Sequence, residues 1–376
     1  MRRIQSDYIF KDLSKKMVFL VGPRQAGKTW LAKEIAKLFQ HPVYLNYDRR
    51  EDRTIIQSEG WLESTDLLII DELHKMPRWK QYIKGVFDTK PQHTAILVTG
   101  SARLDTFNSG GESLAGRYFV HHLLPLSPAE LRNTPYTQDL NRLLQRGGFP
   151  EPFLADTDQA ADRWRLQYVN GLIREDILDF EQIHNLRAIQ LILDLLRDRV
   201  GSPISYASIA GDVGVSPSTV RKYLQILEAL YIIFRVTPFT KNVARSLLKE
   251  PKMYFFDTGM VANDPGKRFE NLVATCLLKY IYERNDYLGQ RVTLQYLRTK
   301  EGKEVDFCLT KDNTIEYLLE AKHANKNVDP ALKYFSEKYQ LKAIQLVQET
   351  KREYKVNERI TLRDARDFLG ELSILK

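Results

Sequence analysis

Long hydrophobic runs and cysteines are scarce in this sequence, and each scarcity excludes a class of protein. No apolar run approaches the roughly 18 residues of a membrane-spanning helix, and the first residues, MRRIQSDYIFKDL, mix charged with apolar side chains. We therefore expect a cytoplasmic protein with no membrane partner. The two cysteines, Cys276 and Cys308, are too few for a disulfide framework or a four-thiolate zinc site, so we expect both to be buried and inert.

The charge balance and the length suggest what kind of partner and how many domains to expect. There are 56 basic and 48 acidic residues, a net charge of +8, which suits a polyanionic partner. We expect this partner to be nucleic acid, DNA before RNA, and we keep a homo-oligomer open. At 376 residues the chain exceeds what one hydrophobic core organises, so two to four units are expected.

The order of apolar segments predicts an α/β fold that begins with a P-loop NTPase parallel sheet. Short β-rich runs alternate with helical stretches between Met17 and Leu123. A mostly helical lid follows, then short helices with two β-rich segments, typical of a winged helix, and finally a small α/β domain. The predicted domains are the ATPase core (1–126), the lid (127–186), the winged helix (187–262) and the C-terminal domain (263–376).

A phosphate-binding motif follows the first apolar run and opens a helix. Residues 22–29 read GPRQAGKT, which fits GxxxxGKT in the context that this motif requires. Backbone N–H groups would face the phosphates, Lys28 would reach the β and γ oxygens, and the Thr29 hydroxyl would ligate magnesium. The predicted ATP-binding residues are Gly22, Pro23, Arg24, Gln25, Ala26, Gly27, Lys28 and Thr29.

A second motif places two acids at the end of an apolar strand. In LLIIDE, Asp71 is expected in the magnesium shell, whereas Glu72 is expected to polarise the attacking water. Another strand intervenes in the sequence between the phosphate loop and this one, a feature of ATPases with an extra central strand. The strand AILVT leads to Ser101, which would bring a hydroxyl near the γ-phosphate if AILVT lies between the two motif strands; a plain turn serine is the alternative.

These motifs resemble AAA-type ATPases, and in particular a prokaryotic group with the signatures GPRQxGKT, LxxDExxxxP, TGS, LxGR and PLSxxE. This chain has GPRQAGKT, LIIDELHKMP, TGS, LAGR and PLSPAE, so the resemblance covers the whole first domain. It implies that Arg117 in LAGR senses the γ-phosphate, in cis or in a neighbouring subunit, with a surface salt bridge as the alternative. Arg174 in the lid is the weaker candidate.

The predicted winged helix would carry a polar recognition face. Ser216 is the expected N-cap and Pro217 the first residue of the second helix. Apolar positions of this helix should face the core, and its outward face could meet nucleic acid or dock another domain. The residues expected to contact nucleic acid there are Ser218, Thr219, Arg221 and Lys222.

Charged residues of the last domain are spaced for a metal site. A hairpin with its turn near Asp312 would bring Asp306 and Glu320 together, with Lys322 two residues further on the same face. Asp306, Glu320 and the Ala321 carbonyl would hold Mg²⁺ or Mn²⁺, Glu270 could complete the shell, and Lys322 would orient the nucleophile. A solvated charge set without metal is the alternative. Upstream, Tyr296, Arg298 and Thr299 are expected near a backbone phosphate, whereas Asp257 is expected to cap a turn.

This arrangement resembles PD-(D/E)xK nucleases of the restriction-endonuclease type, although Val305 stands where the strict motif has proline. The resemblance implies an ATP-dependent enzyme in which the ATPase gates a metal-dependent nuclease acting on nucleic acid. Two alternatives stay open: a nucleotide-dependent switch or assembly ATPase in defence or stress signalling, and a remodelling ATPase whose nuclease-like domain only binds nucleic acid.

Overall fold

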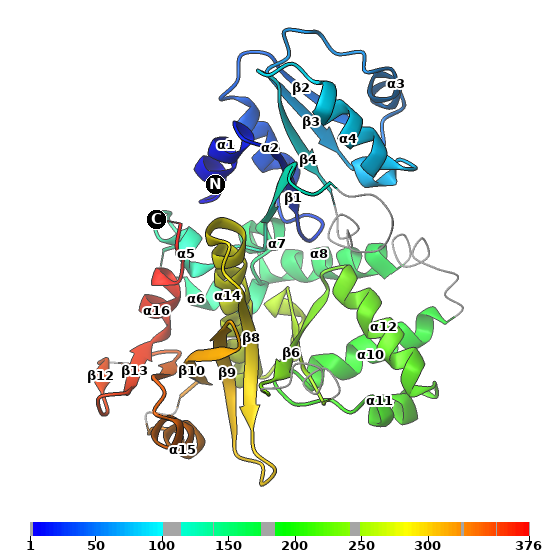
Figure 1. Cartoon of the computed structure of the whole chain (residues 1–376). Helices are drawn as coiled ribbons and strands as arrows, with labels where there is room; N and C mark the ends of the chain where they lie inside the picture. The colour runs from blue at the N-terminus through cyan, green and yellow to red at the C-terminus, as the bar shows by residue number, and fades with distance from the viewer. Residues whose placement is uncertain are drawn as a thin grey trace. The chain divides into compact units, whose positions relative to one another are not determined.

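The computed structural model describes residues 3–100, 114–137, 139–173, 185–240, 249–324, 327–350 and 352–375 (Figure 1). They divide into two compact units, one formed by the chain up to Leu124 with Leu375, the other by Pro125–Ile374. The division lies close to the predicted boundary at residue 126. None of the described helices is long and apolar enough to cross a membrane. Ser101 and Arg174 lie outside the described residues, so their roles stay predictions.

The first unit is built on a five-stranded parallel sheet in the order β2-β3-β4-β1-β5. All five strands lie where the apolar runs predicted them. They are β1 (Met17–Val21), β2 (Pro42–Asn46), β3 (Leu67–Asp71), β4 (Ala95–Thr99) and β5 (Tyr118–His122). The strand β4 lies between β1 and β3, so the extra central strand expected from the sequence is confirmed.

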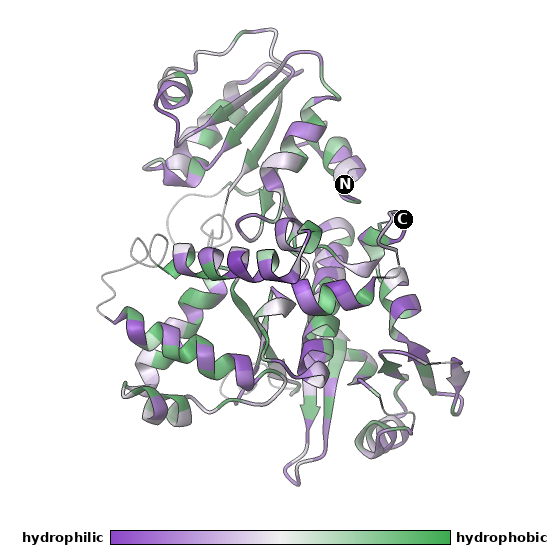
Figure 2. Ribbon diagram, turned by 180° about the vertical axis from the view of Figure 1, so that it is seen from behind, coloured by the Kyte–Doolittle hydropathy of each residue, from purple (hydrophilic) through white to green (hydrophobic). Residues whose placement is uncertain are grey.

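Helices cover both faces of this sheet because its strands are apolar on both sides, as the continuous green of most of them shows (Figure 2). The helices are α1 (Ser6–Leu13), α2 (Lys28–Ala36), α3 (Arg50–Ser58), the 3-10 turn η1 (Leu73–Lys75) and α4 (Trp79–Thr89). On one face, Leu31 of α2 packs with Leu20 in a cluster that also includes α1. On the other, Ile83 of α4 packs with Phe19 in a cluster that also includes α3. Alternate residues of β1 therefore enter opposite cores.

The second unit is mainly helical in its first half. Its helices are α5 (Pro128–Leu131), α6 (Leu140–Arg146), α7 (Pro150–Leu154), α8 (Asp158–Gly171), α10 (Leu186–Asp198), α11 (Tyr206–Val213), α12 (Pro217–Ala229), the 3-10 turn η4 (Thr258–Met260), α14 (Pro265–Leu288), α15 (Pro330–Tyr339) and α16 (Ala365–Glu371). The expected N-cap of α12 is confirmed, since Ser216 accepts a hydrogen bond from the Thr219 N–H with Pro217 at the first position.

One sheet of eight strands runs through the second unit in the order β12-β13-β11-β10-β9-β8-β6-β7. The strands are β6 (Ile233–Pro238), β7 (Lys252–Phe255), β8 (Val292–Arg298), β9 (Glu304–Lys311), β10 (Thr314–Lys322), β11 (Ala343–Val347), β12 (Tyr354–Lys355) and β13 (Ile360–Asp364). The last helix and the strands β12 and β13 were not expected from the sequence. The hairpin β6–β7 joins the C-terminal strands because β6 pairs in parallel with β8. The predicted boundary at residue 262 therefore falls inside a continuous sheet.

Candidate functional site

The phosphate-loop motif forms the turn between β1 and α2. Gly22 and Gly27 have φ angles of 139° and 96°, in the region that favours glycine. At Gly22 a Cβ atom would lie 2.3 Å from the Leu123 carbonyl oxygen, so the chain passes too close for any side chain. Gly27 is the N-cap of α2, and the first N–H groups of that helix have no partner within it, so the motif ends at an anion-binding helix terminus.

Lys28 lies folded over this loop. Its ammonium group donates to the carbonyl oxygens of Gly22 at 2.8 Å and Pro23 at 2.7 Å, and the residue is only 7% exposed. The positive charge is therefore concentrated where the motif holds the β and γ phosphates of a nucleotide.

A residue that the sequence did not single out also supports the loop. Arg3 is 3% exposed; its Nη1 donates to the Ala26 carbonyl at 3.2 Å and its Nη2 to the Leu124 carbonyl. A basic residue near the start of a chain gives no sequence signal for this position. Arg3 therefore links the phosphate loop to the chain that follows β5.

Asp71 gathers four donors at the end of β3. Its Oδ2 accepts from the Thr29 hydroxyl at 2.9 Å and from the Tyr44 hydroxyl at 2.7 Å. Its Oδ1 accepts from the Thr99 hydroxyl and from the Glu72 N–H, the latter at 3.1 Å. Tyr44 and Thr99 lie on β2 and β4, the two strands beside β3. Neither residue was singled out from the sequence, although their places on the predicted parallel strands could have indicated that they lie close to Asp71.

The paired oxygens of Thr29 and Asp71 fit the magnesium ion that the phosphate-loop motif implies. A hydroxyl and a carboxylate, 2.9 Å apart beside the phosphate loop, are the hard oxygen donors that Mg²⁺ prefers. Thr29 and Asp71 would hold the ion, which would supply charge neutralisation at the phosphates.

Glu72 follows Asp71 at the end of β3, and its side chain lies beside His74 and Lys75. Its backbone is left-handed, with φ at 57°, and its Oε2 lies 3.6 Å from His74 Nε2 and 3.8 Å from Lys75 Nζ. Burial, and then the negative charge of Asp71, raises the pKa of Glu72 above its ordinary value. A carboxylate with a raised pKa is suited to accept a proton from water near neutral pH.

Arg117 is not placed to sense the γ-phosphate within its own chain. It immediately precedes β5, and its carbonyl accepts from the N–H of Met17, the first residue of β1. The phosphate loop follows the last residue of β1, so Arg117 lies at the end of the strands opposite the phosphate loop. Its guanidinium forms two hydrogen bonds with Asp88, at 2.8 and 3.0 Å, which is the surface salt bridge left open by the sequence. Supply to a neighbouring subunit stays a prediction.

In the second unit, the structure brings Asp306 and Glu320 together as predicted. The hairpin β9–β10 turns at Asp312, and the Asp306 N–H donates to Glu320 Oε2 at 3.1 Å. The Ala321 N–H donates in return to Asp306 Oδ2 at 3.1 Å. Lys322 contacts Glu320 at 2.6 Å, so the predicted carboxylates and the lysine are neighbours.

A second lysine, unexpected from the sequence, lies among these acids. Lys252 on β7 is fully buried, and its Nζ lies 2.8 Å from Glu304, 3.2 Å from Asp306 and 3.5 Å from Glu270. Burial alone would lower its pKa, but the three carboxylates raise it above the ordinary value, so the ammonium stays charged. The charge set thus contains its own cation.

The predicted metal ligands do not fit a divalent ion while Lys252 occupies this place. The described residues contain no group of three or more His, Cys, Asp or Glu side chains arranged to hold a metal. Glu270 also accepts from the Tyr254 hydroxyl at 2.7 Å, and burial followed by the charge of Asp306 raises its pKa to about 7. For Glu320 the same two causes raise the pKa well above its ordinary value. In this structure the residues of the expected shell form ion pairs: Glu270 and Asp306 lie beside Lys252, and Glu320 lies beside Lys322.

The predicted nucleic-acid residues divide into exposed and buried ones. Ser218, Arg221 and Lys222 are exposed on α12, and Thr219 is half-buried; their contact with nucleic acid stays a prediction. Arg298 is exposed, with Glu304 3.5 Å away. Tyr296 is the exception, because it is 2% exposed and its hydroxyl donates to the Glu250 carbonyl at 2.7 Å. A phosphate contact by Tyr296 is therefore ruled out by its burial.

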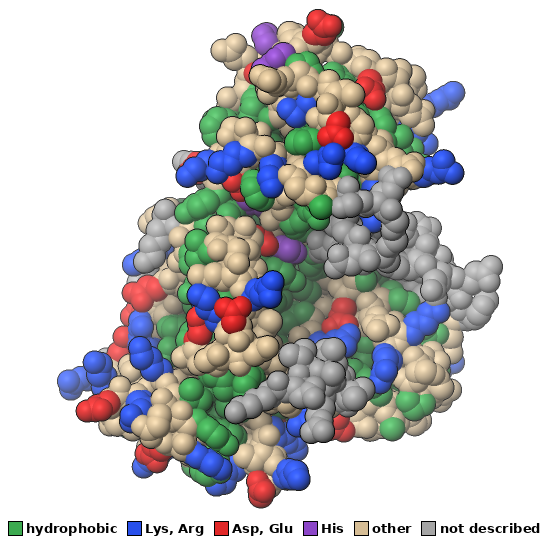
Figure 3. All heavy atoms as spheres, in the orientation of Figure 1, with side chains coloured by type: hydrophobic (Ala, Val, Ile, Leu, Met, Phe, Trp, Pro, Cys, Tyr) green, Lys and Arg blue, Asp and Glu red, His purple; other side chains and the backbone are tan. Residues whose placement is uncertain are grey.

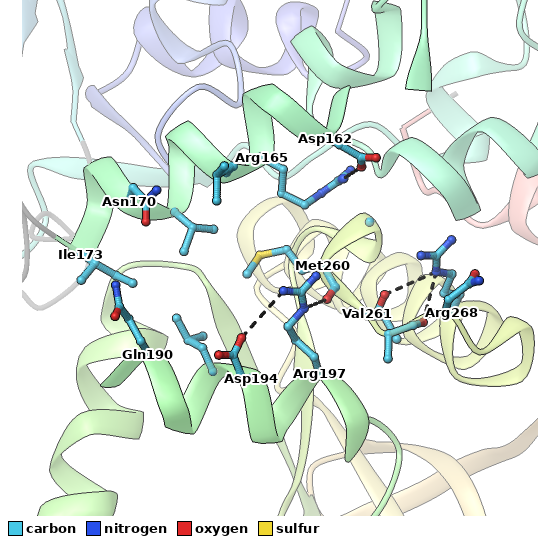
Figure 4. A pocket seen from close by; sticks show the side chains of 16 residues that line it. Asp162, Arg165, Asn170, Ile173, Gln190, Asp194, Arg197, Met260, Val261 and Arg268 are labelled. Carbon is cyan, nitrogen blue, oxygen red and sulfur yellow. Dashed lines mark hydrogen bonds and ion pairs between the residues drawn. The ribbon is translucent and has the colours of Figure 1, made fainter. Parts of the chain in front are cut away.

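A hollow of about 580 Å³ in the second unit is lined by α8, α10 and the η4 turn (Figure 4). Arg197 Nε donates to the Met260 carbonyl at 2.8 Å, and Arg165 Nη1 donates to Asp162 at 2.6 Å. Beneath it, Asp257 accepts from Arg165 Nε at 2.7 Å and from the Gly259 N–H at 3.2 Å. The predicted capping role of Asp257 is confirmed.

Comparison with known proteins extends these observations. Residues 14–132 match the model of a family described as an AAA domain, and residues 137–264 and 265–366 match two domains of unknown function, DUF8612 and DUF4143. A solved Walker-type ATPase of Pyrococcus abyssi is 14% identical, with 69% of this chain and 94% of that chain covered at a TM-score of 0.46.

Two relatives illustrate how far the similarity reaches. An uncharacterized protein of Mycobacterium tuberculosis is 28% identical over 247 residues, 65% of this chain and 55% of that protein, so the match spans about half of its length. One of Methanocaldococcus jannaschii is 25% identical over 364 residues, 86% of this chain and 79% of that protein. The phosphate loop, the strand order and the family match together identify residues 14–132 as an AAA-type P-loop ATPase domain that binds nucleotide.

Proposed function

We propose that this chain hydrolyses ATP and uses the nucleotide cycle to act on nucleic acid, which its second unit holds without cutting. The observation that carries the first part is the 2.9 Å hydrogen bond from Thr29, at the phosphate loop, to Asp71 at the end of β3, with the acid Glu72 next in the chain. The observation that favours holding over cutting is the ammonium of Lys252 among Glu270, Glu304 and Asp306.

The residues of the first unit divide the work of hydrolysis. The phosphate loop and Lys28 hold the β and γ phosphates, and Asp71 with Thr29 would hold a magnesium ion, which would supply neutralisation of their charge. Glu72 accepts a hydrogen bond from the attacking water and takes its proton as the water oxygen bonds to the γ-phosphorus, while the bond from that phosphorus to the β–γ bridging oxygen breaks and ADP leaves. Arg3 keeps Ala26, and so the loop, in position.

Two variants test ATP hydrolysis, one at the phosphate-binding lysine and one at the proposed general base. Lys28→Ala should lose nucleotide binding and hydrolysis together, because the ammonium contacts the phosphates. Glu72→Gln should keep ATP binding and lose about 10²- to 10⁴-fold in kcat, the usual size of a general-base contribution. Equal kcat in Glu72→Gln and the wild type would contradict the assignment of the base.

A cleavage assay distinguishes a second unit that only binds nucleic acid from one that cuts it. The full chain is incubated with single-stranded and duplex DNA and RNA in Mg²⁺ or Mn²⁺, with and without ATP. We expect binding at low salt without cleavage, and ATP hydrolysis unchanged in Asp306→Ala. Cleavage that disappears in Asp306→Ala, and that ATP modulates only when Lys28 is intact, would instead establish the gated nuclease. A change of oligomeric state on ATP binding, with no affinity for nucleic acid, would support the assembly switch.

A further inference from the structure

A groove of about 1010 Å³ lies between the turn that joins β8 to β9 and the helix α15. Four cationic side chains line it, namely Arg298, Lys300, Lys303 and Lys338, against one acid, Glu301. All four are exposed, and Arg298 is partly neutralised by Glu304 at 3.5 Å. Figure 3 shows Lys and Arg side chains beside apolar surface at the lower end of the view, where this hairpin and α15 lie. The groove is therefore positively charged and open to solvent.

Aromatic rings form the wall of the groove on the α15 side. Tyr339 is 53% exposed, and its ring stacks on that of Phe335 with centroids 6.1 Å apart and planes at 20°. The ring of Tyr334 lies next, with Lys303 3.8 Å and Lys338 5.1 Å from its centroid. An exposed flat ring backed by a second one provides a platform on which another planar group can stack.

We propose that this groove binds single-stranded nucleic acid, with a base stacked on Tyr339 and the phosphates beside Lys300 and Lys303. This inference rests on the proposed function and names the surface and the form of its nucleic-acid ligand. Every base has a π-face, so aromatic stacking combined with cations binds single strands with little sequence preference. The volume lies at the upper end of the roughly 300–1000 Å³ of small-molecule pockets, which suits an extended ligand.

The same geometry discriminates against duplexes. In a duplex the faces of the bases are stacked on one another, so Tyr339 could reach only their edges or the sugar and phosphate backbone. The lysines alone would then provide a salt-dependent attraction without the stacking energy. An acidic peptide would satisfy the cations but would leave the exposed ring without a planar partner.

The test is fluorescence anisotropy with the full chain and labelled oligothymidylate, oligouridylate and a DNA duplex of equal length. Tyr339→Ala should weaken single-strand binding by about 5- to 100-fold, the range that loss of one stacked base produces. Tyr339→Phe keeps the ring and should bind like the wild type. In the Lys300→Gln/Lys303→Gln variant the slope of log K against log salt should become less steep by about 1.4, because each lost phosphate contact removes about 0.7 from the slope for a single strand. Lys355→Gln, an exposed lysine on β12, is the matched charge control.

The outcomes separate this inference from the function on which it rests. Wild-type binding to single strands that Tyr339→Ala and Lys300→Gln/Lys303→Gln leave unchanged would overturn the groove while keeping the proposed function. No wild-type binding to any oligonucleotide at low salt would overturn both. Equal affinity for duplex and single strand, or displacement of the oligonucleotide by polyglutamate at lower concentration than by unlabelled strand, would also contradict the proposal. Oligothymidylate and oligouridylate, compared directly, show whether DNA or RNA is preferred.

Discussion

The carboxylate of Glu72 should set the acid limb of the ATPase pH profile. Because burial and Asp71 raise its pKa, hydrolysis should fall as the pH drops through that raised value, at higher pH than the roughly 4.3 of an ordinary glutamate. The positive charge of Lys75, 3.8 Å away, lowers this pKa. In Lys75→Gln the acid limb should therefore move to higher pH, as measured by kcat against pH. A limb at the same pH in both proteins would show that another group titrates.

Lys252 should contribute strongly to the stability of the second unit. In Lys252→Met, three carboxylates lose their buried cation, and breaking a buried ion pair by removing one partner costs about 3–5 kcal/mol. A carboxyl with a raised folded-state pKa stabilises at low pH and loses that contribution as the pH rises through the folded pKa. Glu270, at about 7, behaves in this way, and its pKa should rise further without Lys252.

The destabilisation of Lys252→Met should therefore be larger at pH 8 than at pH 5. Urea unfolding at the two values measures it. Lys355→Met is the control, since an exposed lysine on β12 should change the free energy of unfolding by no more than about 0.5 kcal/mol. A loss for Lys252→Met as small as that of the control would mean that water, not the lysine, compensates the carboxylates.

At the scale of elements, the two glycines of the phosphate loop should respond differently to alanine. Both have positive φ, so each substitution carries backbone strain of about 1–3 kcal/mol. Gly27→Ala adds no clash, because nothing lies within 4 Å of the new Cβ, whereas in Gly22→Ala it would meet the Leu123 carbonyl. We expect Gly22→Ala to lower both the melting temperature and the ATP affinity more than Gly27→Ala. The reverse order would show that the loop moves away from Leu123.

The strands of the first sheet could be predicted from the sequence, whereas one strand pairing of the second sheet could not. The five strands of the first sheet and the β9–β10 hairpin followed from local apolar patterns and motif spacing, whereas the central position of β4 was given only as a condition. The pairing of β6 with β8 did not, because strands about 60 residues apart carry no local signal of their register. Lys252 was missed for this reason: at the start of a short strand it reads as an exposed charge until β7 is placed in the sheet with β9.

At the scale of the whole molecule, we expect nucleotide to stabilise only the first of the two compact units against unfolding. A ligand that binds only the folded state adds about 2.7 kcal/mol at 100 times its Kd. Scanning calorimetry with ATP and Mg²⁺ should therefore raise one transition, that of the unit up to Leu124, and leave the transition of Pro125–Ile374 in place. Lys28→Ala should abolish the shift. A single transition that moves as a whole would show that the units unfold together.

The cluster around Lys252 also bears on how this part of the chain can have evolved. Two families meet between residues 264 and 265, yet Lys252 lies on one side of that junction and all three of its carboxylates lie on the other. The junction also separates Asp264, the N-cap, from the helix α14 that it caps. Recombination at this point would leave the Lys252 ammonium in one protein and its three carboxylates in another. We therefore expect the two segments to be stable only together, and an expression boundary placed between them should yield two insoluble halves.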